Sequence, residues 1–438
     1  MPIFNKKMNA KNIADAGAGN SAFRAGHGAR YFLCFAAILL MGAAPLWAQA
    51  SFKLKSAPAD LNVLLNGDLI KPLSAASGIR NYKIDKEGVL SFTAAGYQTI
   101  EYHSSVLPVK KGLVEIKLEL EKGLLQYKAE YKTGSQPKSA YFSPDGKRLF
   151  VPLLGQHGID VFQQMGGFLK YEKRLTVPGS KSAGFVEALC DEKRRELWIS
   201  NMEEDKLHVY DLDTLEYKTS VGTGGIFPKV VVQNPSGDIT VTSNWVSMDL
   251  SFFDSDSKKL LYKIPVGGTP RGLAFSPDGS LLYTAIYDAS LVVVVDMAQK
   301  KITSRYRFAQ GEGAARHIIY SNGKLYVSDM FRGTVNILDA STGALLRSKY
   351  VGMNINTIIL SSDGRYVFAA SRGRNNPVDY TTPGPDFGAV YMLNAEDLSL
   401  IEKIWGRNQP TGLGMSPDGK LLVFTDFLDE NLELYWMP

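Results

Sequence analysis

A four-residue turn that recurs along the chain is the feature that most limits how this sequence can fold. A short apolar run precedes and follows each copy, as in Leu273-Ala274-Phe275 and Leu281-Leu282-Tyr283. The copies and variants are Ser143–Gly146, Asn234–Gly237, Ser276–Gly279, Ser321–Gly323, Ser361–Gly364 and Ser416–Gly419. Proline early in the turn and glycine at its end are typical of a type I hairpin turn. Each copy therefore predicts two antiparallel strands joined by a tight turn.

The spacing of these turns predicts the architecture. Their final glycines, from Gly146 to Gly419, are 91, 42, 44, 41 and 55 residues apart, and the first interval contains a degenerate unit near 191–195. A period of about 40–45 residues with four short strands per unit is typical of a β-propeller. Seven units result, with first strands near Ser139, Glu187, Val230, Gly272, His317, Thr357 and Gly412.

The two ends of the repeat region predict how the ring closes. After its turn, the last unit has room only for strands at 421–425 and 432–437, so it lacks an outer strand. Residues 124–132 resemble the outer strands at 260–265 and 301–308. Pairing them with the last unit would cover two exposed sheet edges. We therefore expect an all-β, seven-bladed β-propeller over residues 123–438, closed by an N-terminal outer strand.

The repeat segments LLYTAIYDASLVVVVD and KLYVSDMFRGTVNILD resemble the YVTN-type β-propeller repeat family, which includes lactonase-like seven-bladed propellers. Residues 51–122 have a different pattern. Alternating runs at 61–65 and 113–120 and the Asn66-Gly67 turn predict a small antiparallel β-sandwich. With its Ala94–Tyr97 segment, this region resembles a PEGA domain, and that resemblance implies interaction rather than chemistry.

The N-terminal segment predicts export. Five Lys and Arg residues precede an apolar run at 31–47, which ends in Ala48-Gln49-Ala50, and these are the parts of a secretory signal peptide. Cleavage after Ala50 would make residues 1–50 a leader and leave a periplasmic, secreted or cell-surface protein without a membrane span. Retention as an anchor is the alternative, although about 17 apolar residues are few for a span.

Charge and cysteine content narrow the possible partners. The net charge of +5 falls to +1 without the leader, which carries five basic residues and one acid. Charge therefore gives no reason to expect a nucleic acid partner. The remaining cysteine, Cys190, can form neither an intrachain disulfide nor a cysteine metal site.

The repeat register predicts a candidate site on one face of the propeller. First strands begin and second strands end on this face, around the channel mouth. First-strand starts place Lys138, Glu187, Lys229, Arg271 and Arg316 at nearly equivalent positions, and second-strand ends add Asp288, Asp329, Arg372 and Asp426. Cations around a channel would suit a carboxylate or phosphate ligand. Alternatively, they pair with the neighbouring acids and only join the blades.

The sixth unit carries about a dozen extra residues after its second strand, within 371–388. Arg372, Arg374, Asn375, Asn376 and Tyr380 lie there among glycine and proline. This composition predicts a rigid loop, rich in hydrogen-bond donors, on the mouth face. A tolerated insertion in which Arg372 joins neighbouring blades is the alternative.

Two further hypotheses concern catalysis and metal binding. Residues 313–317 and 325–330 resemble segments of phosphogluconolactonase-like and muconate-lactonising propellers. This resemblance implies a lactonase-like site of Arg316, His317 and Asp329, with aspartate replacing the family's glutamate. Because His317 follows Arg316 in a strand, the two are expected on opposite faces. We expect no metal or cofactor, with one possible exception: calcium bound by oxygens of Glu187, Asn201, Asn244 and Asp329.

The favoured function is therefore binding or scaffolding by an exported propeller. The expected partner is an anionic small molecule, a glycan or a protein segment at the channel mouth. A lactonase or cycloisomerase is the alternative, and the oligomeric state stays open.

Overall fold

The computed structural model describes residues 50–438. They are almost entirely β-structure, with one short 3-10 helix, η1 (Ser104–Val106). The leader predicted at residues 1–50 lies outside the described residues, except for Ala50. In the described part of the chain, no helix has the length and apolar character needed to cross a membrane.

Residues 50–117 form two sheets around one core. One sheet has the order β4 (Ser74–Ala76), β5 (Ile79–Ile84), β1 (Ala50–Ala57), β9 (Leu113–Lys117) and β8 (Val109–Lys110). The other has the order β3 (Asp68–Ile70), β2 (Asn62–Leu65), β6 (Val89–Thr93) and β7 (Ile100–His103). Leu54 and Tyr82 of the first sheet share a hydrophobic core with Val63 and Phe92 of the second.

Two details of this region bear on the sequence predictions. The predicted hairpin turn joins β2 to β3, and Asn66 and Gly67 there have φ angles of 52° and 87°. Asparagine and glycine are the residues that best tolerate positive φ at both central positions of such a turn. The sheets are not wholly antiparallel, because β1 pairs with β9 in parallel.

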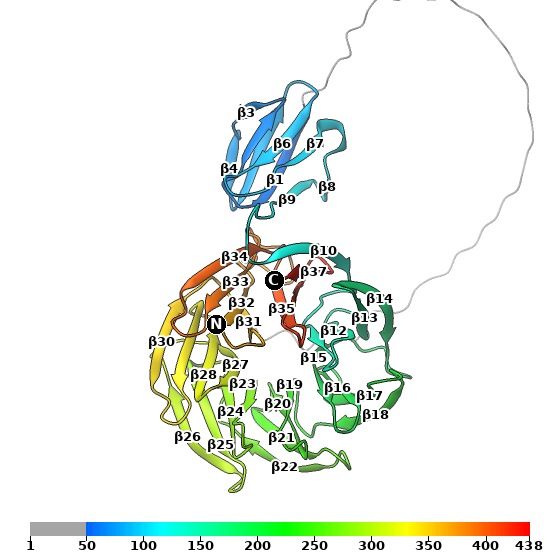
Figure 1. Cartoon of the computed structure of the whole chain (residues 1–438), viewed down its shortest axis with the longest axis vertical. Helices are drawn as coiled ribbons and strands as arrows, with labels where there is room; N and C mark the ends of the chain where they lie inside the picture. Colours follow the sequence, from blue (N-terminus) through cyan, green and yellow to red (C-terminus); the bar gives the residue numbers. More distant parts are fainter. Residues whose placement is uncertain (1–49) are drawn as a thin grey trace, which may run out of the picture. The chain divides into compact units, whose positions relative to one another are not determined.

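Residues 126–436 form seven four-stranded sheets (Figure 1). Six of them follow the chain from first to fourth strand. Their strands are β11 (Tyr141–Phe142), β12 (Arg148–Pro152), β13 (Ile159–Met165), β14 (Phe168–Leu175); β15 (Phe185–Asp191), β16 (Glu196–Asn201), β17 (Lys206–Asp211), β18 (Tyr217–Gly222); β19 (Pro228–Gln233), β20 (Ile239–Asn244), β21 (Asp249–Asp254), β22 (Leu260–Pro265); β23 (Pro270–Phe275), β24 (Leu281–Ile286), β25 (Leu291–Asp296), β26 (Lys301–Arg307); β27 (Ala315–Ser321), β28 (Lys324–Asp329), β29 (Thr334–Asp339), β30 (Leu345–Tyr350); β31 (Ile355–Leu360), β32 (Tyr366–Ser371), β33 (Ala389–Asn394) and β34 (Leu400–Trp405).

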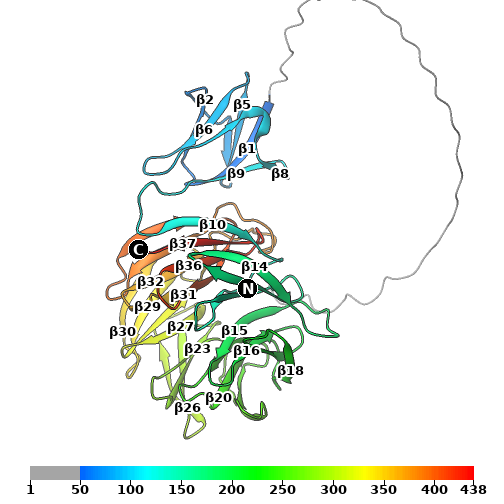
Figure 2. The ribbon, with the colours of Figure 1, turned by 45° about the vertical axis from the view of Figure 1, so that its right-hand side comes forward.

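The seventh sheet combines strands from the two ends of this region. Its order is β10 (Gln126–Lys132), β37 (Asn431–Trp436), β36 (Leu421–Asp426) and β35 (Pro410–Met415). β10 pairs antiparallel with β37 and runs beside it in Figure 2. The predicted pairing of residues 124–132 with the last unit is therefore confirmed.

Apolar packing between neighbouring sheets holds the repeats together. Each sheet shares a hydrophobic core with the next, and the seventh shares one with the first. Inner strands are therefore buried on both faces, as the run Val292–Val295 in β25 shows. The outer strand β26 instead alternates between exposed and half-buried residues. These findings confirm the predicted all-β propeller fold.

The recurring turn owes its shape to its own side chains. In the copy at Ser276–Gly279, the Ser276 hydroxyl donates to Asp278 Oδ1 at 2.6 Å and accepts from the Leu281 amide at 3.0 Å. The Gly279 amide donates to the Ser276 carbonyl at 2.9 Å, and its φ of 71° favours glycine. Serine, aspartate and glycine therefore recur because each closes part of the hairpin.

Candidate functional site

The first strands of six sheets carry a register shift at the candidate site. Pairing between first and second strands skips two residues in each, and the skipped pairs include Glu187, Lys229, Arg271, Arg316, Asn356 and Thr411. Such a β-bulge interrupts the alternation of side chains and re-aims them. The shift repeats at one position because each unit uses the same local geometry.

Arg316 and His317 are the two residues skipped in the β27–β28 ladder. Strict alternation of side chains, on which the expectation of opposite faces depends, does not apply at such a bulge. Burial lowers the pKa of His317 to about 4, and the nearby charges of Glu187, Arg271 and Arg316 also act on it.

Hydroxyl groups from neighbouring sheets fix the backbone at these positions. Each comes from the penultimate residue of a second strand and donates to a carbonyl in the next sheet. The bonds are Ser200 Oγ to Lys229 O at 2.5 Å, Ser243 Oγ to Arg271 O at 2.9 Å and Ser328 Oγ to Asn356 O at 3.0 Å. Sequence reasoning missed these residues, although a serine recurring one place before the strand end was visible.

The structure gathers five cations and one acid, which we call the cationic cluster: Lys138, Lys229, Arg271, Arg316, Arg372 and Glu187. Burial and then the charges of the other four cations hold the pKa of Lys138 well below its usual value. Burial, followed by the charges of Arg271 and Arg372, lowers the pKa of Arg316 to about 9. The cations therefore repel one another in a region with little water.

Glu187 provides the single negative charge of this cluster. Its Oε1 accepts a hydrogen bond from Arg271 Nη2 at 2.5 Å, and its Oε2 accepts one from the Tyr141 hydroxyl. Both members of the ion pair are buried, with side chains 4% and 7% exposed. Despite that burial, the Arg271 charge and these bonds keep the pKa of Glu187 below its usual value. Arg271 is thus paired with a carboxylate.

The other two arginines make only neutral contacts. Arg316 Nε donates to Asn356 Oδ1 at 2.6 Å, and Arg372 Nε donates to Thr411 Oγ1 at 3.2 Å. Within residues 50–438, Arg271 Nη1 and Arg372 Nη2 are buried without any hydrogen-bond partner. Buried guanidinium nitrogens normally find acceptors. The cluster thus presents donors that a ligand could satisfy.

Aromatic rings line the same cations. Lys138 Nζ and Arg372 Cζ each lie 5.0 Å from the centre of the Phe427 ring. Lys229 Nζ lies 4.2 Å from the centre of the Phe227 ring and 5.5 Å from that of Trp245. A ring face attracts a cation by its quadrupole but does not neutralise its charge. The cluster keeps its positive character.

The acids at second-strand ends do not neutralise the cluster. Asp288 accepts from Thr269 N and Oγ1, and Asp329 accepts from Ser290 Oγ at 2.5 Å and Ala314 N at 3.0 Å. Asp426 accepts from the Arg407 amide at 2.8 Å. Burial, then Glu433 and Asp429, hold its pKa well above its usual value. In the described residues, no ion pair joins these acids to Arg271, Arg316 or Arg372.

The insert of the sixth sheet, residues 372–388, contributes Arg372 and otherwise bonds largely to itself. Arg374 pairs with Asp386, with Nη2 2.8 Å from Oδ1. Asn376 accepts from the Val378 amide at 2.9 Å and donates to the Pro383 carbonyl at 3.2 Å. Asn375 Oδ1 is buried and has no partner in the described part of the chain. Arg374 and Asn376, predicted as ligand donors, are thus used to fold the loop.

Two contacts fix this insert from outside. Gln409 Nε2 donates to the Tyr380 carbonyl at 2.6 Å, and Lys55 Nζ of β1 donates to the Gly384 carbonyl at 2.9 Å. Lys55 is buried and also donates to Asn408 Oδ1. The Tyr380 side chain acts electrostatically on Arg372. The loop is therefore anchored close to the cationic cluster.

The residues of the lactonase-like hypothesis lie near one another. Asp329 pairs with Ala315 across the ladder of β27 and β28, next to Arg316 in the sequence. In the described residues, the buried carboxylate of Asp329 accepts hydrogen bonds from Ser290 Oγ and Ala314 N, and none joins it to Arg316 or His317. Across residues 50–438, no group of three His, Cys, Asp or Glu side chains could hold a metal ion.

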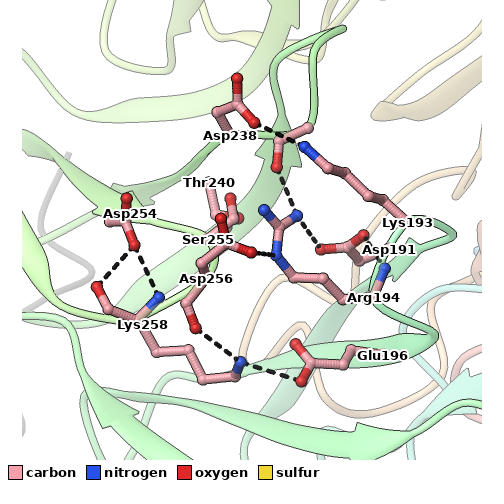
Figure 3. Close-up of polar contacts among 12 residues, drawn as sticks. Asp191, Lys193, Arg194, Glu196, Asp238, Thr240, Asp254, Ser255, Asp256 and Lys258 are labelled. Carbon is pink, nitrogen blue, oxygen red and sulfur yellow. Dashed lines mark hydrogen bonds and ion pairs between the residues drawn. The ribbon is translucent and has the colours of Figure 1, made fainter.

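The opposite face shows how this fold pairs charges when their role is structural (Figure 3). Arg194 lies 3.0 Å from Asp191 and 2.7 Å from Asp256 of the next sheet. Lys193 and Lys258 likewise pair with Asp238 and Glu196. We call this side, which carries the recurring turns, the turn face. Lys193, Arg194 and Lys258 thus have carboxylate partners in neighbouring sheets, whereas within residues 50–438 no ion pair joins Arg316 or Arg372 to a carboxylate.

Comparison with known proteins agrees with this geometry. The YNCE-like beta-propeller family model matches residues 113–277. Antigen Lp49 of Leptospira interrogans serogroup Icterohaemorrhagiae serovar copenhageni (strain Fiocruz L1-130) is 35% identical over 367 residues, 81% of this chain and 78% of the antigen. The chain belongs to the same β-propeller family as this antigen. The residues matched by the YNCE-like model include Lys138 and the strands that carry Glu187, Lys229 and Arg271.

Proposed function

We propose that the protein is a binding protein that holds an anionic ligand in the cationic cluster. The observation that carries this is the charge imbalance: in the described residues, Glu187 pairs with Arg271, whereas the neighbouring buried or half-buried Lys138, Arg316 and Arg372 have no ion pair to a carboxylate. Arg271 Nη1 and Arg372 Nη2 are buried without partners in the described chain. Planar guanidinium groups suit carboxylate or phosphate oxygens, so an anionic small molecule, a glycan acid or an acidic protein segment fits.

The architecture we propose around this site is a seven-bladed ring. Seven four-stranded sheets share seven cores in cyclic order, and β10 completes the last sheet, which supports this reading. Residues 51–122 act as a PEGA-like β-sandwich domain that presents the propeller. The contact of Lys55 with Gly384 supports a role for this domain in holding the insert.

We further propose that residues 1–50 direct export, so that the binding face lies in the periplasm, outside the cell or on its surface. The basic and apolar pattern of this segment supports the proposal. The name of the relative, an antigen, is consistent with exposure of that protein. Protease accessibility of intact cells, compared with lysed cells, tests the location.

The binding proposal is tested by titrating sulfate, inorganic phosphate and citrate into the chain in a calorimeter. Arg372→Met keeps an apolar contact with Phe427 but removes the donors, and we expect it to weaken binding about 10- to 100-fold. Lys193→Met, at an exposed ion pair on the turn face, is the control and should bind as wild type. Unchanged affinity of Arg372→Met for all three anions would show that the proposal is wrong.

Proton uptake gives an independent measurement. A bound anion should raise the pKa of Lys138, which burial and four neighbouring cations now depress. Binding should therefore take up protons, and the apparent binding enthalpy should vary with the ionisation enthalpy of the buffer. Lys138→Met should abolish the part of this buffer dependence that comes from proton uptake by Lys138.

A further inference from the structure

Apolar side chains are exposed in the loops around the channel mouth. We call them the apolar rim: Ile226, Val246, Met248, Phe331, Met353, Val378 and Tyr380. They come from loops that precede a first strand or follow a second strand, in the sheets that begin with β19, β27 and β31. Val378 is 92% exposed, at a loop position fixed by the bond of its amide to Asn376. Exposed apolar patches of this kind mark interaction surfaces.

The apolar rim is continuous with the cationic cluster. Ile226 and Val246 are next in sequence to Phe227 and Trp245, whose rings lie against Lys229. Phe331 follows Met330, whose sulfur accepts from the Tyr287 hydroxyl at 3.5 Å. Tyr287 in turn acts electrostatically on Arg316 and Arg372.

The Trp245 and Tyr287 rings connect the sheets that begin with β19 and β23, with centres 4.5 Å apart. These contacts link loops of the apolar rim to the cationic cluster. A small polar anion could accept hydrogen bonds from the cationic cluster, but it would leave the apolar rim exposed to water.

We propose that the natural ligand is a segment of a partner protein that carries carboxylates flanked by leucine or aromatic side chains. This inference rests on the proposed anion binding at the cationic cluster and specifies its ligand. Carboxylates would reach the unpartnered nitrogens of Arg271 and Arg372, and the apolar residues would cover Phe331 and Val378. Arginine and aromatic residues at a well-packed centre are the groups that dominate binding energy in protein interfaces.

Four synthetic peptides test this inference by fluorescence anisotropy with the chain. The first alternates Glu with Leu or Phe, the second replaces Glu by Gln, the third replaces Leu and Phe by Ser, and the fourth carries both changes. We expect the first peptide to bind at least about tenfold more tightly than any other, because both charge and apolar cover contribute.

Variants of the chain separate the two parts of the surface. The rim variant Phe331→Ser/Val378→Ser should weaken binding of the first peptide about tenfold and leave sulfate binding unchanged. The control Met165→Ser/Phe168→Ser removes two apolar residues that are also exposed, on the turn face, and should change neither. Arg372→Met should weaken both peptide and sulfate.

The outcomes distinguish this inference from the proposed function. If sulfate binding depends on Arg372 but the first peptide does not bind, or binds the rim variant as tightly as wild type, the protein-segment inference is wrong and the anion site stands. Tighter binding of a single-stranded oligonucleotide than of the first peptide also overturns it. If Arg372→Met leaves sulfate and peptide binding unchanged, the proposed function itself fails.

Discussion

Replacing Glu187 by glutamine should destabilise the protein in a way that an anion can reverse. Glutamine has nearly the same shape as glutamate, and its carbonyl can still accept the bond from Arg271. It cannot accept the Tyr141 hydroxyl through its amide nitrogen, and it carries no charge. The substitution therefore removes the carboxylate charge that opposes Arg271 in the cationic cluster.

The magnitude follows from the geometry of the ion pair. Arg271 Nη2 and Glu187 Oε1 are 2.5 Å apart, and both side chains are buried. Two unit charges about 4 Å apart attract by about 4 kcal/mol at an effective dielectric constant near 20. Removing one partner of a buried pair costs about 3–5 kcal/mol in measured cases. We therefore expect Glu187→Gln to lower the free energy of unfolding by about 3–5 kcal/mol.

Urea unfolding at low salt, with and without sulfate, measures this change. Sulfate at about 100 times its dissociation constant should restore about 2.7 kcal/mol. Glu196→Gln is the matched control, because Glu196 is also buried and accepts from Lys218 and Lys258 on the turn face. The Glu196→Gln variant should also lose stability, but sulfate should raise its free energy of unfolding by no more than it raises that of the wild-type protein. A Glu187→Gln protein as stable as wild type, or one that sulfate rescues no better than the control, would refute the reasoning.

Three further predictions concern single side chains. Lys138→Met should raise the free energy of unfolding by about 1–2 kcal/mol in urea and weaken sulfate binding, because it removes a buried charge without a carboxylate partner in the described chain. Ser243→Ala should cost about 1 kcal/mol in the same assay and weaken sulfate binding, because its hydroxyl fixes the Arg271 carbonyl. Burial lowers the pKa of His208 from 6.5 to about 4, so the unfolded chain binds the proton more readily between these values. The contribution of His208 to the free energy of unfolding should therefore be fully present above about pH 6.5 and fall by up to about 3 kcal/mol towards pH 4. In urea unfolding, His208→Gln should flatten this dependence of stability on pH.

The sequence predicted the fold well because the repeat is local. Turn residues such as Ser276 and Gly279 act within one hairpin, so their spacing reports the number of hairpins directly. The pairing of β10 with β37 was also predictable, since the last unit visibly lacks a strand. The parallel pairing of β1 with β9 was not, because strand direction between distant segments leaves no local pattern.

The site was harder to predict because charge pairing depends on distances between sheets. Equivalent repeat positions identified Lys229, Arg271 and Arg316, but not that Arg271 reaches Glu187, 84 residues earlier. The register did place Asp329 opposite Ala315, beside Arg316, but it could not reveal that the Asp329 carboxylate accepts from a loop amide, Ala314 N. The position of a residue within the repeat predicts where it lies around the propeller axis. Its contact partners also depend on how far its side chain extends, and the repeat does not reveal this.

The contrast between the two faces is itself evidence for binding at the channel mouth. A sequence that places Lys193 and Arg194 beside carboxylates on the turn face can neutralise cations where only stability matters. Within residues 50–438, the cationic cluster instead holds Lys138, Arg316 and Arg372 without an ion pair to a carboxylate, and this arrangement costs stability. Packing in the seven apolar cores between the sheets can offset this loss of stability. Local departures from optimal pairing are expected where a site serves a function, so the imbalance indicates a ligand that supplies the missing negative charge.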